Sequence, residues 1–256
     1  MIQSFYSGAN ALSSQRLNID VIADNVANIG TMGYKRARAD FKDALYNRMK
    51  NPVENGPHMN LQHGAGSIPL QINRAFLQGA TLTTERALDF VIEGRGFFTA
   101  RGIDGETLYT RDGAFYIDNE MALVDAAGRY ILDIYGDEIT VLGNPEGMDI
   151  YSDGRIVFYD EDGDVSGEYY LGIVDFINPA GLLSMGDNYF TESENSGFAE
   201  TVENPSGIRN YALESSNVDL AMEVTRMIRA QRAYQFASRA ISVADQMAGI
   251  ANSIRQ

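Results

Sequence analysis

Three aspartates in the stretch DEDGDV come closest to a recognisable metal site in this sequence. Asp160, Asp162 and Asp164 have the spacing of the first three ligand positions of a calcium loop. Such a loop needs glycine next and a bidentate glutamate near its end, where this sequence has Val165 and Leu171. The stretch is therefore interpreted as an acidic turn rather than as a calcium site.

The other candidate groups do not form a catalytic site either. The two histidines, His58 and His63, lie in a segment rich in Gly, Asn and Pro, with Glu54 as the nearby carboxylate. The chain has no cysteine, which excludes thiolate ligands, a cysteine nucleophile and disulfides. No GxSxG motif is present, and none of the 35 acidic residues is singled out by its context. The sequence predicts no enzyme, no cofactor and no metal site.

The charge of the chain is negative and unevenly distributed. Its formal net charge is −15, with +3 in residues 1–50, +2 in residues 217–256 and −20 between them. This excess of carboxylates argues against nucleic acid as a partner. No apolar run reaches the roughly 18 residues of a membrane span, and the N-terminus lacks the pattern of a signal peptide. We expect no membrane insertion and no cleaved signal peptide.

Apolar or small residues recur at steps of three and four through the first thirty residues, from Ile2 to Val26. This spacing predicts a helix over about residues 4–28, ~37 Å long, with a narrow stripe of the coiled-coil kind. Asn25 and Asn28 stand near its end. Asparagine is a poor helix former, and a buried carboxamide needs hydrogen-bond partners. We expect these two side chains to bond to neighbouring subunits or to chain ends that are otherwise unsatisfied. The alternative, which applies above all to Asn28, is that they cap their own helix and the turn that follows it.

The C-terminal region predicts a longer helix, of about 39 residues or ~58 Å. Ser216 or Asn217 is a plausible N-cap, and Asp219 suits the positive end of the helix dipole. Four rows of apolar or small residues repeat every seven positions, among them the row that contains Phe236 and Val243. These rows cover more than half of the circumference. Packing on the N-terminal helix alone would leave some rows exposed, so we predict oligomerisation through both ends.

Between the helices the sequence changes to short β-prone stretches separated by turn signals, including Asp112-Gly113, a favoured hairpin turn. The predicted fold class is α+β, with long coiled-coil-like N- and C-terminal helices forming one helical domain and an all-β central domain. The expected parts are 1–34, the first helix; 35–72, an extended linker or hairpin; 73–210, the β-rich domain; and 211–256, the second helix.

Several motifs resemble those of the bacterial flagellar basal-body rod and hook proteins. Asn25, Val26, Ala27 and Asn28, followed by Thr31, Gly33, Tyr34 and Lys35, match the family's N-terminal pattern. ALDFVIEGRGFF followed by YTRDGAFYID is similar to its central region, and GDNYFTESENSG to the segment before the C-terminal arm. The stretch from LESSNVD through QRAY to DQM resembles its C-terminal helix. The short insert between the arms favours the rod members, distal or proximal, although Asp24, Gly30, Phe236 and Ser238 depart from the usual residues.

The resemblance implies a structural subunit of the flagellar rod. Such a subunit is exported through the flagellar export apparatus without a cleaved signal peptide and polymerises into a hollow drive shaft in the basal body. Its expected partners are copies of itself and other rod and hook proteins. A hook-type axial subunit and a secreted adhesin, with a β domain on a coiled-coil stalk, are the alternatives. A cell-wall hydrolase is a more distant third.

The residues expected to take part in subunit assembly lie on the two helices and in the turn after the first helix. They are Phe5, Leu12, Ile19, Asn25, Val26, Asn28, Thr31, Gly33, Tyr34, Met227, Ala230, Tyr234, Ala237, Ile241 and Ala244.

Overall fold

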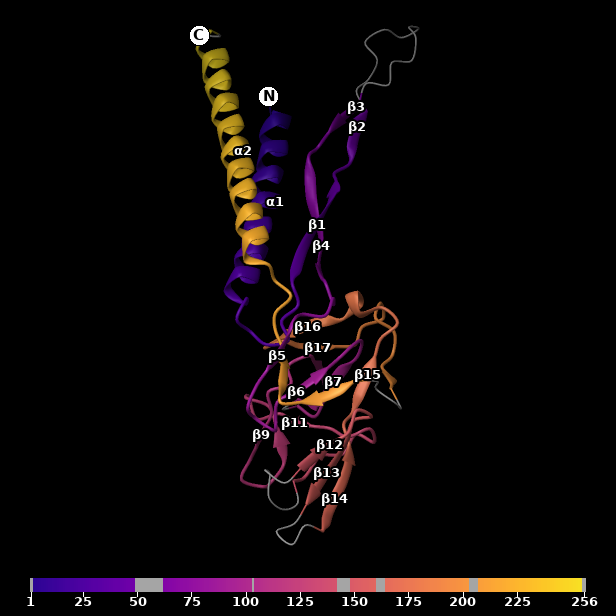
Figure 1. Cartoon of the computed structure of the whole chain (residues 1–256). Coiled ribbons are helices and arrows are strands. Elements are labelled where there is room, and N and C mark those ends of the chain that lie inside the picture. The colour runs from indigo at the N-terminus through magenta and orange to yellow at the C-terminus, as the bar shows by residue number, and fades with distance from the viewer. Residues whose placement is uncertain are drawn as a thin grey trace. The chain divides into compact units, whose positions relative to one another are not determined.

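The structure is a computed structural model that describes residues 2–48, 62–102, 104–141, 148–159, 164–202 and 207–254. These residues contain two long helices and many short strands (Figure 1). The α+β class predicted from the sequence is confirmed. Residues Asp160 and Asp162 of the acidic turn and His58 lie outside the described residues.

The chain divides into two compact units. Unit 1 consists of residues 1–27, 37–74 and 219–256, and unit 2 of residues 28–36 and 75–218. Each unit is therefore assembled from segments that are far apart in the sequence. The domain boundaries proposed from the sequence remain a prediction.

Helix α1 extends over Ile2–Ala27 and contains no proline. It ends close to the predicted position, and the chain then turns, with the Thr31 N–H donating to the carbonyl of Asn28 at 3.2 Å. Gly33 has a φ of +68°, in the left-handed region that side chains other than glycine rarely adopt. The glycine is therefore required by the backbone that follows the helix.

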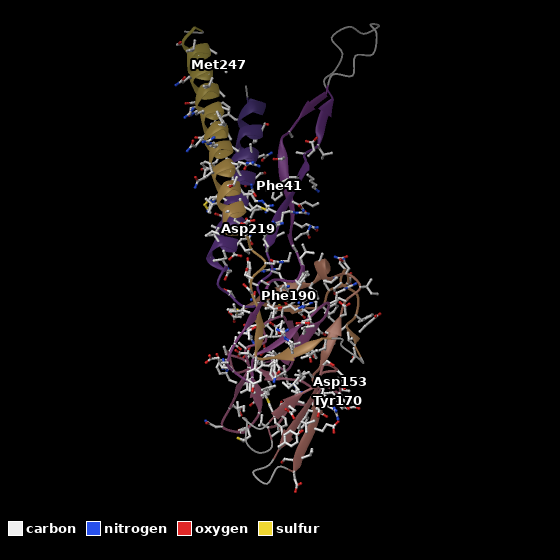
Figure 2. The ribbon with its side chains drawn as sticks, in the orientation of Figure 1. Phe41, Asp153, Tyr170, Phe190, Asp219 and Met247 are labelled. Atoms are coloured by element: carbon white, nitrogen blue, oxygen red, sulfur yellow. The ribbon has the colours of Figure 1, made fainter. Side chains whose placement is uncertain are left out.

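Helix α2 extends over Leu220–Ile254. Its N-cap is Asp219, whose carboxylate accepts a hydrogen bond from the Met222 N–H at 3.1 Å (Asp219 is labelled in Figure 2). The prediction of Ser216 or Asn217 as the cap is therefore wrong. The carboxamide of Asn217 instead bonds to backbone groups of unit 2, because the chain there is still extended.

The remainder of unit 1 is a long antiparallel ribbon. Strand β1 (Ala37–Asp43) pairs with β4 (Ser67–Arg74), with a register shift between Asp40 and Phe41. Strand β2 (Tyr46–Arg48) continues the pairing with β3 (Gln62–Gly64). The described residues between 37 and 74 thus form an antiparallel ribbon. Figure 1 shows this ribbon beside α1 and α2, which run antiparallel to each other.

Unit 2 is built from short antiparallel strands. Its largest sheet has the order β16-β17-β8-β7-β11-β10-β9, and β15 joins it by pairing with both β7 and β18. The order β12-β13-β14 forms a second sheet, and β19-β6 and β20-β5 form two-stranded pairs. The strands are β5 (Thr81–Thr83), β6 (Phe90–Ile92), β7 (Phe97–Arg101), β8 (Thr107–Thr110), β9 (Tyr116–Ile117), β10 (Leu123–Val124), β11 (Tyr130–Ile131), β12 (Met148–Ile150), β13 (Arg155–Tyr159), β14 (Val165–Tyr170), β15 (Ile173–Asp175), β16 (Leu183–Gly186), β17 (Tyr189–Thr191), β18 (Glu200–Thr201), β19 (Ile208–Asn210) and β20 (Ala212–Glu214).

The central strands of the largest sheet of unit 2 are buried on both faces. Successive side chains of a strand point to opposite faces. On β7, Phe98 belongs to the larger cluster of buried hydrophobic side chains and Phe97 to the smaller one. On β17, Tyr189 and Phe190 divide in the same way (Phe190 is labelled in Figure 2). This double burial explains the continuous apolar stretches in the middle of the sequence.

The predicted hairpin turn at Asp112-Gly113 is wrong. Strand β8, before it, pairs with β7 and β17, whereas β9, after it, pairs with β10. A Cβ at Gly113 would lie 1.9 Å from the carbonyl oxygen of Phe90. The glycine therefore permits close approach of two backbones rather than a tight turn.

Candidate assembly surface

The structure places the predicted assembly residues in two different units. Eleven of them lie on α1 and α2 in unit 1. The other four lie in unit 2, where Gly33 and Tyr34 are buried and Asn28 and Thr31 are half-buried. The Thr31 hydroxyl donates to the Asn28 carboxamide oxygen at 3.2 Å, so these two side chains bond to each other. A role for any of these residues between subunits remains a prediction.

Small residues allow α1 and α2 to pack closely. Ala230 and Ala244 are buried on α2, and Ala237 and Ile241 between them are half-buried. A Cβ built on Gly8 of α1 would lie 2.7 Å from a side-chain carbon of Ile241. Gly8 therefore sets the separation of the two helices at this level.

Replacing Gly8 with valine should push the helices apart and lower the midpoint of thermal unfolding of unit 1. Overpacking of this kind costs about 1–3 kcal/mol. Gly249→Ala is the control, because no described residue beyond its own helix backbone and chain neighbours has an atom within 4 Å of its Cβ position. That change should be neutral or stabilising, by up to about 1 kcal/mol. Circular dichroism at the helix signal measures both, and equal effects would contradict close packing at Gly8.

A groove of about 470 Å³ lies between α1, β1 and α2. Val21, Ile22 and Ala230 supply apolar lining, and Arg226 and Arg229 bring positive charge to it. The Arg226 guanidinium donates to the carboxylate of the buried Glu223 at 2.7 Å, whereas Arg229 is exposed. The groove thus combines an apolar lining with an exposed cation.

Asn25 is satisfied inside unit 1. Its carboxamide donates to the carbonyl of Ala37 and accepts from the N–H of Ala37, both at 2.8 Å. The same carboxamide nitrogen donates to the buried carboxylate of Glu223 at 3.3 Å. One side chain therefore links α1, β1 and α2. These bonds fill much of the hydrogen-bonding capacity that we had expected neighbouring subunits to use.

Unit 1 has no extensive apolar interior of its own among the described residues. Both clusters of buried hydrophobic side chains belong to unit 2. Meanwhile α2 exposes large apolar side chains: Phe236 is 68% exposed, Val243 51%, Met247 54% and Ile250 59% (Met247 is labelled in Figure 2). Apolar side chains gathered on one exposed face indicate an interaction surface.

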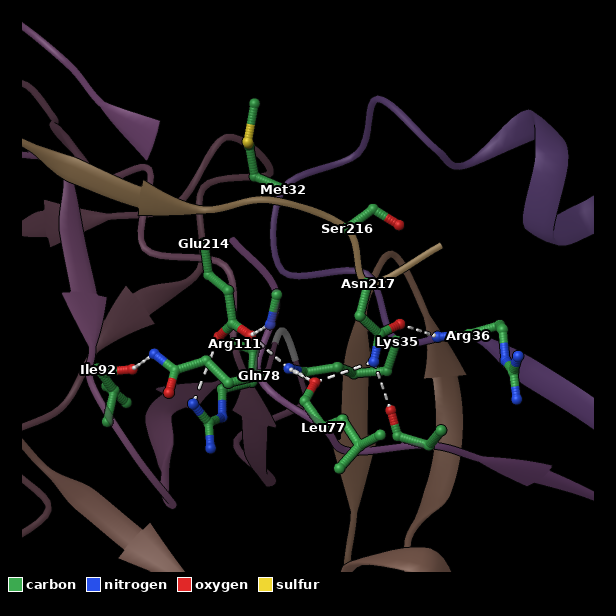
Figure 3. A network of polar contacts seen from close by, with 12 residues as sticks. Met32, Lys35, Arg36, Leu77, Gln78, Ile92, Arg111, Glu214, Ser216 and Asn217 are labelled. Carbon is green, nitrogen blue, oxygen red and sulfur yellow. Dashed lines mark hydrogen bonds and ion pairs between the residues drawn. The ribbon is translucent and has the colours of Figure 1, made fainter. Parts of the chain in front are cut away.

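Unit 2 contains a buried cluster of three charged side chains (Figure 3). The Lys35 ammonium donates to the Glu214 carboxylate at 2.5 Å, and the Arg111 guanidinium donates to its other oxygen at 3.3 Å. All three are at least 95% buried. Burial lowers the pKa of Lys35 and of Arg111 from their usual values, and the Glu214 charge opposes both shifts. The carboxylate is the anionic partner that both cations share.

This cluster joins three distant stretches of sequence. The Glu214 carboxylate also accepts from the Gly79 N–H at 2.7 Å, and Lys35 also donates to the Leu77 carbonyl at 2.9 Å. Asn217 donates to that same carbonyl at 2.9 Å and accepts from the Arg36 N–H at 2.8 Å. The segment after α1, the segment after β4 and the segment before α2 are thereby held together within unit 2 (Figure 3).

Sequence reasoning did not identify Glu223, Glu214 or Arg111 as important residues. Glu223 is 198 positions from its partner Asn25, and Glu214 is 179 positions from Lys35. Arg111 is 103 positions from Glu214. Periodicity and capping rules report only neighbours within about two helical turns. The available signal was that Asn25, Lys35 and Glu214 belong to stretches that matched the family's motifs.

No helix among the described residues is long and apolar enough to cross a membrane. In the same part of the chain, no group of three or more His, Asp or Glu side chains is arranged to hold a metal ion. An exposed apolar face such as that of α2 is typical of proteins that bind other chains. We therefore place the chain in that class.

Comparison with known proteins names the class more closely. Three family models match: "Flagella basal body rod protein" over residues 5–35, "Flagellar hook protein FlgE/F/G D1 domain" over 91–158 and "Flagellar basal body rod FlgEFG protein C-terminal" over 209–254. The chain is 36% identical over 256 residues to the flagellar basal-body rod protein FlgG of Bacillus subtilis, covering 96% of this chain and 97% of that one.

A second rod protein FlgG, from Borreliella burgdorferi, is 35% identical over 269 residues. The alignment covers 100% of this chain and 100% of that one. The flagellar hook-basal body complex protein FlhP of Bacillus subtilis is 28% identical over 272 residues, again with full coverage of both. The chain belongs to the flagellar basal-body rod protein family. It is a structural protein of the flagellar basal body, as the resemblance of its motifs predicted.

Proposed function

We propose that copies of this chain polymerise through unit 1 into the hollow flagellar rod, with α1 and α2 packed in coiled-coil fashion around the channel. The rod transmits torque and conducts exported subunits, and the chain reaches it through the flagellar export apparatus. The observation that carries this proposal is the exposed apolar surface of unit 1. Unit 1 has two long helices and a ribbon, yet its large apolar side chains on α2 are exposed.

The free energy available from covering this surface is substantial. Full burial of one large apolar side chain contributes about 1.5–3 kcal/mol. Phe236, Val243, Met247 and Ile250 repeat this contribution in every copy. Association gains only the surplus left after the loss of rotational and translational freedom. Rows of such contacts along a polymer therefore supply both assembly and stiffness.

The distribution of charge favours contact through unit 1. Unit 1 contains 11 Lys/Arg and 8 Asp/Glu, a net charge of +3, whereas unit 2 contains 9 and 27, a net charge of −18. Copies that approach through unit 2 repel one another strongly, and those that approach through unit 1 repel one another far less. Unit 1 is accordingly the assembly unit of this proposal.

The direct test is mass spectrometry of purified hook–basal bodies from the source cells. We expect this chain in a constant ratio to the hook subunits. Its absence from intact, functional basal bodies would overturn the proposal. Limited proteolysis adds a second measurement, since α1 and α2 should be digested faster in the free chain than in the polymer.

The variant Phe236→Asp should abolish swimming. Its carboxylate would replace an apolar side chain that the assembly buries, and removing a charge from water is costly, while the free chain, in which the side chain is exposed, keeps its fold. We expect at least about a tenfold loss of the chain from basal bodies, equivalent to about 1.4 kcal/mol of association. Tyr135→Asp is the matched control, because Tyr135 is 80% exposed in unit 2. Normal swimming by Phe236→Asp would remove this face of α2 from the interface.

A further inference from the structure

Helix α1 exposes one continuous stripe of residues along its length. The stripe advances by alternating steps of three and four, and each member is exposed: Tyr6, Ala9, Ser13, Arg16, Asp20, Ala23 and Ala27. This face is opposite the side of α1 that carries the buried Ser14, Ile22 and Asn25. Four of its seven residues are Ala or Ser, and its one acidic residue, Asp20, stands in the C-terminal half. A second helix can approach such a surface closely.

Helix α2 exposes a stripe of the same period, in which basic and large apolar side chains replace the small side chains of the α1 stripe. Its members are Arg229, Arg232, Phe236, Arg239, Val243, Gln246 and Ile250, all exposed. The N-terminal part is cationic, and the part beyond Arg239 is mainly apolar. Stripes with steps of three and four are the surfaces that pack in coiled coils.

We propose that the exposed stripe of α2 in one copy binds the exposed stripe of α1 from a second copy, in antiparallel orientation, with Asp20 against Arg229. The inference rests on the proposed function and identifies the contact through which the copies assemble. Antiparallel packing brings the acidic half of one stripe to the cationic half of the other. It also brings the small residues Ala9 and Ser13 to the bulky apolar side chains of α2. Parallel packing would set Asp20 among the apolar side chains instead.

The register follows from the contacts inside one copy. There Gly8 is level with Ile241 and Asn25 with Glu223, so facing residue numbers add up to 248 or 249. A second copy at the same height would place Asp20 level with Arg229, Ser13 with Phe236, and Ala9 with Ala240. The charge pair and the contact between small and bulky side chains therefore form in the same register, with no axial shift between the two copies.

At one level of this contact the arrangement is unfavourable, because the positive charges of Arg16 and Arg232 lie close together. Asp20 lies at the adjoining level, and its carboxylate is 3.9 Å from the Arg16 guanidinium. That ion pair is exposed and contributes little in the free chain. In the assembly the same carboxylate lies among three guanidinium groups and offsets their repulsion.

Because the two stripes differ, the contact is heterologous. Each copy offers one α1 stripe and one α2 stripe, so binding on one side leaves a stripe free on the other. Such contacts generate rings or helical filaments rather than closed dimers. The proposal therefore accounts for continued growth as well as for the pairing of two copies.

Cysteine cross-linking in basal bodies tests the geometry, and the chain offers a clean background because it has no native cysteine. The double variant Ala9→Cys, Ala240→Cys should give a ladder of linked copies on oxidation of purified basal bodies. The control Ala9→Cys, Thr225→Cys carries its second thiol on the exposed side of α2, fifteen residues or ~22 Å away along the axis. A ladder of equal strength from the control, or none from the Ala240 pair, would overturn the proposal.

Exchange of charges tests the specific pair. Asp20→Arg and Arg229→Asp should each reduce the number of assembled basal bodies about tenfold, equivalent to about 1.4 kcal/mol, without changing the unfolding midpoint of the free chain. The double variant should restore assembly. Normal assembly of the two single variants would exclude the pairing of Asp20 with Arg229. So would a double variant that folds but still fails to assemble. Absence of the unaltered chain from basal bodies would instead refute the proposed function.

Discussion

Replacing Glu214 with alanine should lower the free energy of unfolding of unit 2 by about 3–5 kcal/mol. The change leaves Lys35 and Arg111 buried beside each other without their shared anion. It also removes the acceptor of the Gly79 N–H. Denaturant unfolding followed by the near-ultraviolet signal of the tyrosines of unit 2 measures the loss. This is the largest effect that we expect from a single polar substitution in unit 2.

Glu93→Ala is the control for Glu214→Ala. Glu93 is also paired with an arginine, Arg209, at 3.2 Å, but about half of each side chain is exposed. An exposed ion pair contributes about 0–1 kcal/mol, so this change should be nearly silent. If both variants lost the same stability, the burial of Glu214 would not be the reason for its effect.

Replacing Asn25 with alanine should destabilise unit 1 by roughly 2–4 kcal/mol, and swimming should fail with it. The variant leaves the N–H and the carbonyl of Ala37 without their partner and removes one donor from Glu223. A buried polar group left unsatisfied costs about 1–3 kcal/mol. Hydrogen exchange at the Ala37 amide reports the change directly and should accelerate by a factor of about ten or more, given 1.4 kcal/mol for each factor of ten.

Asn18→Ala serves as the comparison on the same helix. Asn18 is half-buried and lines the groove, and its side chain forms no hydrogen bond with any other described residue. Both variants gain the same helix propensity, about half a kcal/mol, so any difference between them arises from the lost bonds. If the Ala37 amide exchanged its hydrogen at the same rate in the two variants, Asn25 would not be the residue that holds β1 to α1.

These two sites give the N-terminal signature a physical meaning. Asn25 ties the ribbon to the helices within unit 1, and Gly33 and Lys35 tie the following segment into unit 2. The backbone N–H of Gly33 donates to the carbonyl of Glu214 at 2.7 Å, so a residue near the start of the chain is bound to one near its end. The signature therefore serves the fold of each unit, whatever it also contributes between subunits.

Local sequence patterns were sufficient to predict the helices, the β-rich body and the family. Apolar residues at steps of three and four predicted both helices, and α1 and α2 lie where that pattern placed them, with ends displaced by a few residues. The alternation of turn signals and β-prone stretches predicted the β-rich body. Such patterns are local, since a helix or a strand is recognisable from residues within a few positions of each other.

The contacts between distant residues could be identified only from the folded chain. No local rule could pair Lys35 with Glu214 or Asn25 with Ala37 and Glu223, because these pairs form only when separate segments converge. The same convergence made Gly113 a point of close backbone contact rather than a hairpin turn, and made Asp219 the cap of α2 instead of Asn217. Packing and buried hydrogen bonds depend on distance in space, and the sequence records only distance along the chain.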